Sequence, residues 1–335
     1  MRNTLFLALG ISSGIAAAAF LRRAKLDLAG KVVFITGGSR GLGLLLAKAF
    51  ARGGARVAIC ARDSEELIKA KELLSGLTND VLTIEADMTM REEAELAIEK
   101  IQRALGPIDV LVNNAGVISV GPLESTTIDD YRSSINTHFW GPYFATMAVL
   151  PQMRRRRRGR IVNISSIGGK ISVPHLLPYS VGKFALTGFS EGLRSELRKD
   201  NILVTTVCPG LMRTGSPRNA LFKGQNEAEY AWFSVSDSLP VFSMNAERAA
   251  RKIVSATQYG CAELVLSLPA KVAVKLHGVA PGLTGEMLGI ANWLLPGPGG
   301  IGTGIRTGQQ SSSEISPSWI TALNERAAKQ NNEVI

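Results

Sequence analysis

Cysteine and histidine are scarce in this chain. The three cysteines, Cys60, Cys208 and Cys261, lie far apart and form no CxxC pair. The three histidines are equally scattered, and no spacing typical of metal ligands is present. These absences argue against a disulfide scaffold and against a Cys/His metal module. Because Cys60 and Cys208 end apolar runs, we interpret them as small buried hydrophobic side chains in a reducing compartment.

Acidic residues are too few to balance the basic ones. The 335 residues include 38 Lys and Arg against 28 Asp and Glu, which gives a formal net charge of +10. Much of the excess lies in Arg22, Arg23 and Lys25 and in the run Arg154–Arg158. No aromatic residues are interleaved with this run, so we expect no nucleic-acid partner. We interpret the run as a solvated helix end stabilised by the helix dipole, with contact to a membrane surface as the alternative.

Charge is absent from Thr4–Leu21, which is mostly apolar. As a helix this stretch would be roughly 27 Å long at about 1.5 Å per residue, close to the bilayer core of about 30 Å. We interpret residues 1–25 as a membrane anchor that stays attached and keeps the following basic residues on the cytoplasmic side. A signal peptide cleaved near the small residues Ala16–Ala19 is the alternative.

From Lys31 onward, short β-branched runs alternate with amphipathic stretches. This alternation predicts a Rossmann-type α/β fold, a doubly wound parallel sheet with helices on both faces, over residues 26–269. The predicted strands are Val32–Ile35, Arg56–Cys60, Val81–Glu85, Val110–Val112, Ile161–Ile164, Leu203–Val207 and Glu263–Leu268. The predicted helices include Leu42–Arg52, Glu65–Ser75, Arg91–Leu105, Ile135–Met153 and Tyr179–Lys199.

Residues 270–335 differ in composition from this domain. Ala270–Leu295 is apolar, and a Gly/Pro-rich stretch, Pro296–Gly304, follows it. The apolar segment could complete a pocket, form an oligomer contact or lie in a membrane interface. The polar tail beyond Gln309 is expected to be loose, although Trp319–Ala328 could form a short helix.

The first predicted strand leads into a glycine-rich turn with the sequence TGGSRGLG and then into a helix. Gly37 permits a tight turn, Gly41 allows the backbone to approach a diphosphate, and Gly43 allows the helix to pack on the strand. The free N–H groups of the helix N-terminus attract the same anion. The turn therefore predicts a dinucleotide site, to which Ser39, Arg40 and Leu42 also belong.

The spacing TGxxxGxG resembles the short-chain dehydrogenase/reductase family, and the resemblance extends from about Asp27 to Leu268. An NNAG sequence begins at Asn113, and a PGxxxT turn begins at Pro209. In the family these segments, and an acidic residue after the third strand, contact the cofactor. The resemblance thereby implies cofactor contacts by Asp87, Met88, Asn113, Asn114, Ala115, Gly116, Tyr179, Lys183, Pro209, Gly210 and Thr214.

The same resemblance implies a catalytic tetrad of Asn136, Ser166, Tyr179 and Lys183. Tyr179 and Lys183 form the YxxxK motif, and Ser166 stands thirteen residues before Tyr179. Four residues apart on a helix, Tyr179 and Lys183 share one face. The ammonium, helped by the positive nicotinamide of the oxidised cofactor, should lower the tyrosine pKa from about 10 towards the working pH. Ser166 can hold the substrate oxygen, and Asn136, by analogy with the family, orders a water that joins Lys183 to solvent. His138 is expected to be structural, whereas His175 could border the substrate.

Cofactor choice can be predicted from charge. An NAD enzyme needs an acid after the second strand to bond the ribose hydroxyls, but Ala61 stands there. Arg40 and Arg62 suit a 2′-phosphate instead, so we expect NADP(H) to be favoured over NAD(H). Asp63 is the one dissenting residue, and we expect it to point outward or to cap the helix that begins near Ser64.

These features predict an NADP(H)-dependent oxidoreductase that interconverts a carbonyl and an alcohol. Apolar and aromatic residues after Thr214 are either core or the wall of a pocket for a lipophilic substrate. We expect a membrane-anchored protein, with a homo-oligomer possible. The alternative is a non-catalytic dinucleotide-binding or membrane scaffold protein on the same fold, which the intact tetrad argues against.

Overall fold

A seven-stranded parallel sheet forms the centre of the computed structural model, which describes residues 25–78, 80–241, 243–313, 316 and 321–334. Its strand order is β11–β7–β6–β4–β1–β2–β3, and every neighbouring pair is parallel. This confirms the predicted Rossmann-type fold. The strands are β1 (Val32–Thr36), β2 (Arg56–Ala61), β3 (Val81–Glu85), β4 (Val110–Asn113), β6 (Gly159–Ile164), β7 (Ile202–Pro209) and β11 (Glu263–Leu266).

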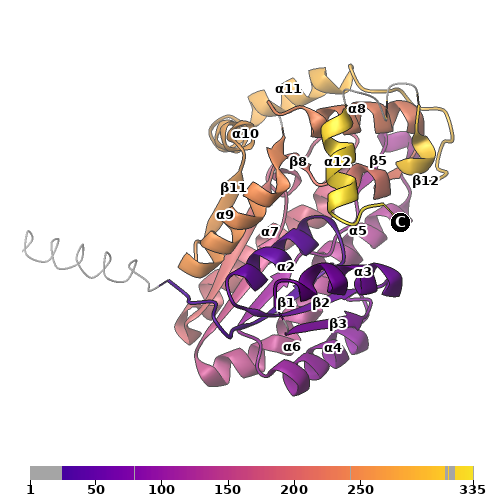
Figure 1. The fold of residues 1–335 in the computed structure, drawn as a ribbon. Coiled ribbons are helices and arrows are strands. Elements are labelled where there is room, and N and C mark those ends of the chain that lie inside the picture. The colour runs from indigo at the N-terminus through magenta and orange to yellow at the C-terminus, as the bar shows by residue number, and fades with distance from the viewer. Residues whose placement is uncertain (1–24, 79, 242, 314–315, 317–320, 335) are drawn as a thin grey trace, which may run out of the picture.

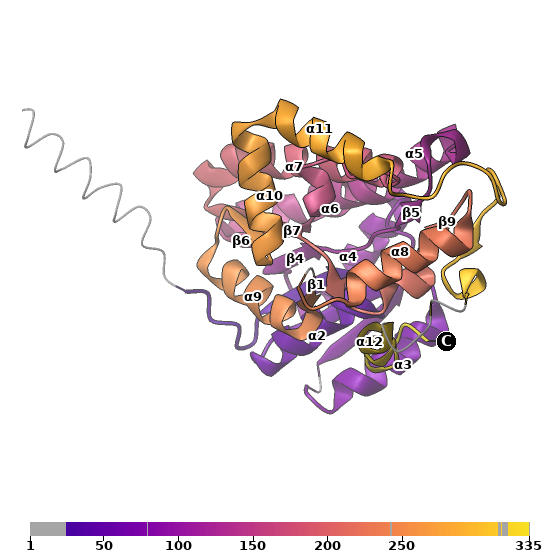
Figure 2. The ribbon, with the colours of Figure 1, turned by 90° about the horizontal axis from the view of Figure 1, so that it is seen from above.

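Helices cover both faces of the sheet (Figure 1, Figure 2). Along β1, Val33 and Ile35 pack with one layer of helices, while Val32 and Phe34 pack with the other. A strand buried on both faces needs apolar residues throughout, which explains why no polar alternation is visible in the sequence. The first layer is α2 (Gly41–Arg52), α3 (Ser64–Ser75) and α9 (Ala246–Tyr259), and the second is α4 (Arg91–Leu105), α6 (Gly141–Arg156) and α7 (Leu177–Leu197).

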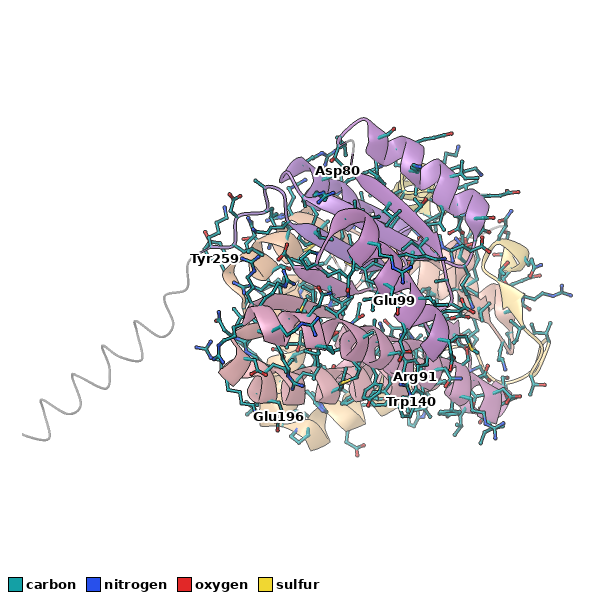
Figure 3. All side chains as sticks on the ribbon, turned by 90° about the horizontal axis from the view of Figure 1, so that it is seen from below. Asp80, Arg91, Glu99, Trp140, Glu196 and Tyr259 are labelled. Carbon is teal, nitrogen blue, oxygen red and sulfur yellow. The ribbon has the colours of Figure 1, made fainter. Side chains whose placement is uncertain are left out.

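Helix α4 illustrates how the outer surface is built. Its buried face includes Ile98, whereas its outer face carries the ion pairs Arg91–Glu95 at 2.8 Å and Glu99–Arg103 at 3.0 Å. Figure 3 shows Arg91 and Glu99 on this outer face. Such exposed pairs contribute little to stability, so the buried stripe is what holds the helix on the sheet.

The long helix predicted over Ile135–Met153 is interrupted. Helix α5 (Ile128–Ile135) ends at a π-helical turn, η2 (Asn136–Trp140), and α6 begins at Gly141. A Cβ atom at Gly141 would lie 3.2 Å from the Met88 carbonyl oxygen, so this position packs tightly against the loop after β3. A π turn changes the helical phase of the residues that follow it, and such turns are frequent at functional sites.

Short strands and turns gather beside the carboxyl ends of the sheet. One cluster of buried side chains, including Val120, Leu176, Phe222 and Phe233, joins them to α8. The short strands are β5 (Ser119–Val120), β8 (Met212–Arg213), β9 (Leu221–Phe222), β10 (Met244–Asn245) and β12 (Arg306–Thr307), and α8 is Asn226–Ser238. The 3-10 turns are η1 (Leu123–Ser125), η3 (Ile167–Gly169), η4 (Arg198–Asp200), η5 (Ser216–Asn219) and η6 (Gln309–Ser311).

The region after the sheet forms three further helices. Helices α10 (Leu268–Val279) and α11 (Pro281–Asn292) pack against each other, as Figure 2 shows. Helix α12 (Ala322–Gln330) packs on α8, and residues 331–333 after it are buried. The expectation of a loose polar tail was therefore wrong, because the polar side chains of the tail find hydrogen-bond partners on the domain.

The predicted membrane anchor, Thr4–Leu21, lies outside the described residues. Within the part of the chain that the structure describes, no helix combines the length and the apolar character needed to cross a bilayer.

Candidate active site

A cavity of about 1100 Å³ opens beside the carboxyl ends of the parallel strands. It is lined by the glycine-rich turn after β1 and by the segments that follow β2, β3, β4, β6 and β7. In open α/β sheets this edge is where ligands bind. All of the site residues predicted from the sequence line this cavity except Asn113 and Asn136.

The glycine-rich turn has the geometry that a dinucleotide requires. Gly37 and Gly41 have φ values of +62° and +55°, in the left-handed region that favours glycine. A Cβ atom at Gly43 would lie 2.0 Å from the Gly37 carbonyl oxygen, so no larger residue fits there. Helix α2 begins at Gly41 and has no acidic residue in its first turn, which keeps its N-terminus favourable for phosphate.

The two asparagines after β4 have different tasks. Asn114 donates from Nδ2 to the Gly37 carbonyl oxygen at 2.9 Å, which ties the end of β4 to the glycine-rich turn. Asn113 does not line the cavity, and its Nδ2 donates to Asn163 Oδ1 at 2.8 Å, a buried link between β4 and β6. The cofactor contact of Asn113 stays a prediction.

Ser166, Tyr179 and Lys183 meet on one wall of the cavity. Lys183 lies one turn after Tyr179 on α7, and its Nζ donates to the Ile164 carbonyl oxygen at 2.9 Å and lies 5.6 Å from the Tyr179 ring centroid. Ser166 Oγ accepts a hydrogen bond from the Gly168 N–H at 3.0 Å. The chain thus brings a hydroxyl, a phenol and an ammonium together, as the sequence predicted.

Burial is the main cause of the shifted pKa values of Tyr179 and Lys183. Burial raises the pKa of Tyr179 to about 12, against the opposing effect of a hydrogen bond with Ser166. Burial also lowers the pKa of Lys183 to about 7. The expectation that Lys183 lowers the tyrosine pKa is therefore not met by the protein alone, because removal from water penalises both charged forms.

The catalytic role of Asn136 stays a prediction, while His138, which was expected to be structural, lies at the site. Asn136 belongs to the η2 turn but does not line the cavity, whereas His138, two residues later, does. The His138 ring stands edge-on to the Tyr179 ring with centroids 5.3 Å apart, and its Nε2 lies 2.9 Å from the Val117 carbonyl oxygen. Residues two apart on a helix point in different directions, so the π turn decides which of them faces Lys183. Sequence periodicity carried no signal for this.

The predicted phosphate-binding arginines are not free of carboxylates. Arg40 lies 3.5 Å from Glu66 and 3.7 Å from Glu333, while the exposed Arg62 lies 3.9 Å from Asp87. Ser39 Oγ also donates to Glu66 at 2.6 Å. Sequence analysis missed both glutamates, because Glu66 lies within α3 and Glu333 lies near the other end of the chain.

Two smaller predictions have opposite outcomes. Asp63 caps α3 by accepting a hydrogen bond from the Glu66 N–H at 2.9 Å, which confirms its expected capping role. His175 does not line the cavity, because its Nδ1 lies 2.7 Å from Glu229 in a buried pair. The wall in that region is instead apolar and is formed by Val173, Leu176, Trp232 and Phe233.

Comparison with known proteins agrees with this site. The family model for short chain dehydrogenases matches residues 31–222. The chain is 34% identical over 259 residues to dehydrogenase/reductase SDR family member 7B from Bos taurus, which covers 75% of this chain and 78% of that relative. The chain therefore belongs to the short-chain dehydrogenase/reductase family, whose members are oxidoreductases that bind a nicotinamide dinucleotide.

Solved structures support the same assignment. A short-chain dehydrogenase from Streptomyces avermitilis is 32% identical and superposes with a TM-score of 0.68, covering 79% of this chain and 98% of its own. L-sorbose reductase from Gluconobacter frateurii, solved in complex with NADPH and L-sorbose, is 26% identical, with a TM-score of 0.64 and coverages of 72% and 97%.

Proposed function

We propose that this protein is an NADP(H)-dependent oxidoreductase that interconverts a carbonyl and an alcohol of a lipophilic substrate. The observation that carries the proposal is the meeting of Ser166, Tyr179 and Lys183 on the wall of a cavity that also contains the glycine-rich turn. A dinucleotide bound at that turn would supply the hydride in reduction. The protein supplies the proton and the groups that orient the reacting oxygen.

The chain's own residues divide this work. Ser166 holds the substrate oxygen by a hydrogen bond, and Tyr179 donates its phenolic proton to that oxygen as the carbonyl carbon receives hydride. Lys183 then returns a proton to the phenolate. With a pKa of about 7, the Lys183 ammonium can release its proton near neutral pH. The balance is one hydride and one proton added to the carbonyl, which gives the alcohol.

Three features favour NADP(H). Arg40 in the glycine-rich turn and Arg62 after β2 line the cavity, and Ala61 stands where an NAD site needs an acid. Asp63, the nearest carboxylate in sequence, is occupied as the cap of α3. The guanidinium of Arg40, held beside the glycine-rich turn, is suited to bond a 2′-phosphate.

Apolar side chains beside Tyr179 support a lipophilic substrate. Val173, Leu176, Trp232 and Phe233 line the cavity and belong to the cluster against which Tyr179 packs, and an apolar substrate gains from leaving water against them. A substrate held there would have its oxygen within reach of the Tyr179 side of the cavity.

Membrane association is the second part of the proposal. Besides the uncharged Thr4–Leu21 segment, helix α11 and the turn after it expose large apolar side chains, with Trp293 and Leu294 exposed to 85% and 86%. Lys271 and Lys275 lie on the neighbouring α10. Apolar side chains beside lysines suit a surface that rests in the headgroup region of a membrane with anionic lipids.

Replacement of Tyr179 by Phe tests the catalytic part. The variant keeps the ring but lacks the proton donor, so turnover of apolar ketones and aldehydes should fall by about 10²–10⁴. Oxidation of NADPH followed by absorbance measures this, and an unchanged melting temperature shows that the variant is folded. Near-parental turnover in a folded variant would contradict the role of Tyr179.

A further inference from the structure

His138 is fully buried, and only one of its ring nitrogens has a partner among the described residues. Nε2 lies 2.9 Å from the Val117 carbonyl oxygen, which can only accept, so Nε2 must carry the proton. Nδ1 is left with a lone pair and no partner in the described part of the chain. A buried acceptor without a partner costs free energy, which calls for a functional reason.

The space that Nδ1 faces also borders the catalytic lysine. A Cβ atom at Gly116 would lie 3.6 Å from His138 Nδ1 and 3.7 Å from Lys183 Nζ, so both nitrogens border one small volume beside Gly116. Burial, and then the charge of Lys183, hold the pKa of His138 well below its usual value. The ring is therefore a neutral acceptor beside an ammonium group.

We propose that His138 is a further positioning residue, which orients the Lys183 ammonium, directly or through a water, for return of the proton to Tyr179. This inference rests on the proposed function. The lone pair of Nδ1 stabilises the charged form of Lys183, and the Nε2–H bond to Val117 fixes the tautomer that makes this possible.

Two replacements at this turn test the inference. His138→Phe, which removes the acceptor, should lower kcat by about tenfold or more with little change in KM, and the alkaline limb of the rate profile should move to lower pH. His138→Asn, which can still accept, should restore part of kcat and of that limb. An unchanged kcat in the His138→Phe variant, or an unmoved alkaline limb, would overturn the inference.

A second measurement does not depend on turnover. The ¹⁵N resonances of His138 in the full chain, assigned with the His138→Phe variant, should report a neutral ring with the proton on Nε2 at pH 7. Lys183→Met should shift the Nδ1 resonance. A proton on Nδ1, or no response to Lys183→Met, overturns the role of His138 even if the oxidoreductase function stands, whereas inactivity on every carbonyl with these shifts intact counts against the function alone.

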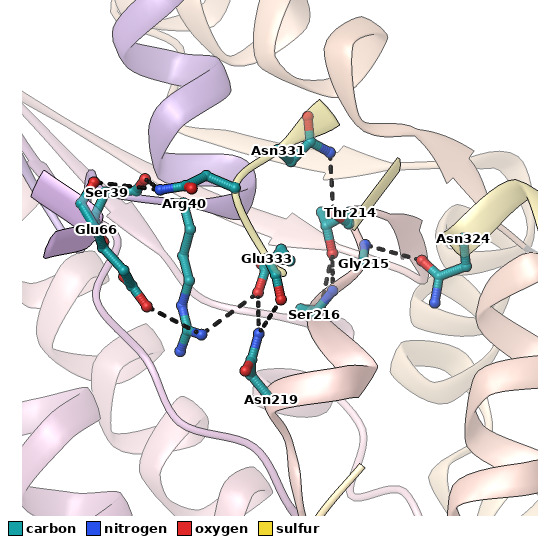
Figure 4. Close-up of polar contacts among 11 residues, drawn as sticks. Ser39, Arg40, Glu66, Thr214, Gly215, Ser216, Asn219, Asn324, Asn331 and Glu333 are labelled. Atoms are coloured by element: carbon teal, nitrogen blue, oxygen red, sulfur yellow. Dashed lines mark hydrogen bonds and ion pairs between the residues drawn. The ribbon is translucent and has the colours of Figure 1, made fainter. Parts of the chain in front are cut away.

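A separate observation concerns the end of the chain. The Asn331 carbonyl oxygen accepts from the Gly41 N–H at 2.8 Å, and Asn332 donates to the Ser39 carbonyl oxygen at 3.0 Å. The Glu333 carboxylate lies so close that a Cβ atom at Gly41 would be 2.4 Å from its Oε1. Figure 4 shows Glu333 beside Arg40. The tail residues 331–333 thus lie on the glycine-rich turn itself.

The other side of the tail is held by the segment after β7. Asn331 donates from its side chain to the Thr214 carbonyl oxygen at 3.0 Å, and Asn219 donates to Glu333 Oε2 at 2.6 Å. The Gly215 N–H donates to Asn324 on α12 at 2.9 Å. Both the turn and Thr214 line the cavity, so the tail crosses the predicted cofactor path between them.

We infer that the tail residues 331–333 compete with the phosphate groups of the dinucleotide. A carboxylate and a carbonyl oxygen occupy the helix N–H and the guanidinium that would otherwise bind phosphate. This inference also rests on the proposed function. When the tail covers the site in most molecules, only the remaining fraction can bind the cofactor. The apparent affinity is reduced by that fraction, so the tail lowers the affinity for the cofactor.

Cofactor titration without any carbonyl substrate tests the competition. A chain that ends at Gln330 should bind NADPH at least about fivefold more tightly than the full chain, and Glu333→Gln should lie between them. Added synthetic peptide 321–335 should weaken binding to the shortened chain. Glu325→Gln is the matched control. Glu325 lies on α12 and pairs with Arg218 at 2.7 Å, so its replacement should leave the affinity for NADPH unchanged.

The outcomes distinguish competition by the tail from the proposed oxidoreductase function. Equal or weaker binding by the shortened chain would overturn the competition but leave the oxidoreductase function standing. If neither chain binds NADPH or NADH, both the competition and the proposed function are wrong.

Discussion

Arg40 is proposed to bind the 2′-phosphate of the cofactor, and it also contacts the tail through Glu333. It lies between Glu66 and Glu333, whereas Arg62 is 79% exposed and only loosely paired with Asp87. A charge-assisted bond from a held guanidinium contributes more than one from a solvated side chain. Arg40 should therefore contribute more than Arg62 to the recognition of a 2′-phosphate.

We predict that Arg40→Ala lowers the ratio of NADPH to NADH affinity by about tenfold or more, and that Arg62→Ala lowers it less. Because Glu333 of the tail pairs with Arg40, the ratio is measured on a chain that ends at Gln330, which removes the influence of the tail. Fluorescence titration measures it, with the exposed Arg103→Ala on α4 as a control. Equal affinities for the two cofactors in the parent chain would contradict the NADP(H) proposal.

For individual residues, the positions of the motif residues could be predicted from the sequence, but their surroundings could not. Ser166, Tyr179 and Lys183 lie at fixed spacing on one strand end and one helix, so the sequence was enough to bring them together. The raised pKa of Tyr179 depends on burial by distant segments, which local spacing does not contain. That His138 lines the cavity and Asn136 does not depends on the helical phase of the η2 turn, which the local sequence does not reveal.

Helices α10 and α11 leave large apolar side chains uncovered by the rest of the described chain. Val279, Trp293 and Leu294 are each exposed to about 85% or more, although their side chains are large and apolar. Scattered apolar residues are normal on a surface, but here they follow one another along a helix pair. This arrangement gives the membrane proposal a second element besides the N-terminal segment.

We predict that the full chain sediments with membranes and resists extraction by 1 M salt. Attachment through Arg154–Arg158 alone would weaken, since the Debye length falls to about 3 Å at that ionic strength. A chain that begins at Lys25 should remain active; its release would identify the N-terminal segment as the sole anchor. If it stays bound, replacing Trp293 and Leu294 by Ser should release it.

Two results would contradict this prediction. Recovery of the full chain without membranes would exclude stable attachment. A new N-terminus just after Ala19 would identify a cleaved signal peptide and so overturn the cytoplasmic orientation.

The sequence pattern predicted one continuous helix where the structure has α5, the π turn and α6. Residues 128–156 carry no proline or glycine between Ile135 and Trp140 that would announce the π turn. Helix α6 even contains Pro151 without ending there. We attribute the helical phase of these residues to a tertiary contact, the packing of Gly141 against the loop after β3.

For the whole molecule, the parallel sheet was predictable because seven apolar runs separated by amphipathic helices admit few other folds. The regions outside this sheet were less predictable. The short strands β5, β8, β9, β10 and β12 have two residues each, too few for any periodicity to register. The tail was expected to be loose because its polar residues have no local partners; its partners lie on the glycine-rich turn.

The contact between the tail and that turn spans almost the entire chain. Asn332 and Ser39, which it joins, are 293 positions apart. At about 5–20 residues per second, a ribosome needs roughly 15–60 s to make the chain between them. During that interval the turn exists and its competitor does not. A dinucleotide present in the cell can therefore reach the nascent domain before the tail is made, so newly made protein would be loaded more readily than protein that has once released its cofactor.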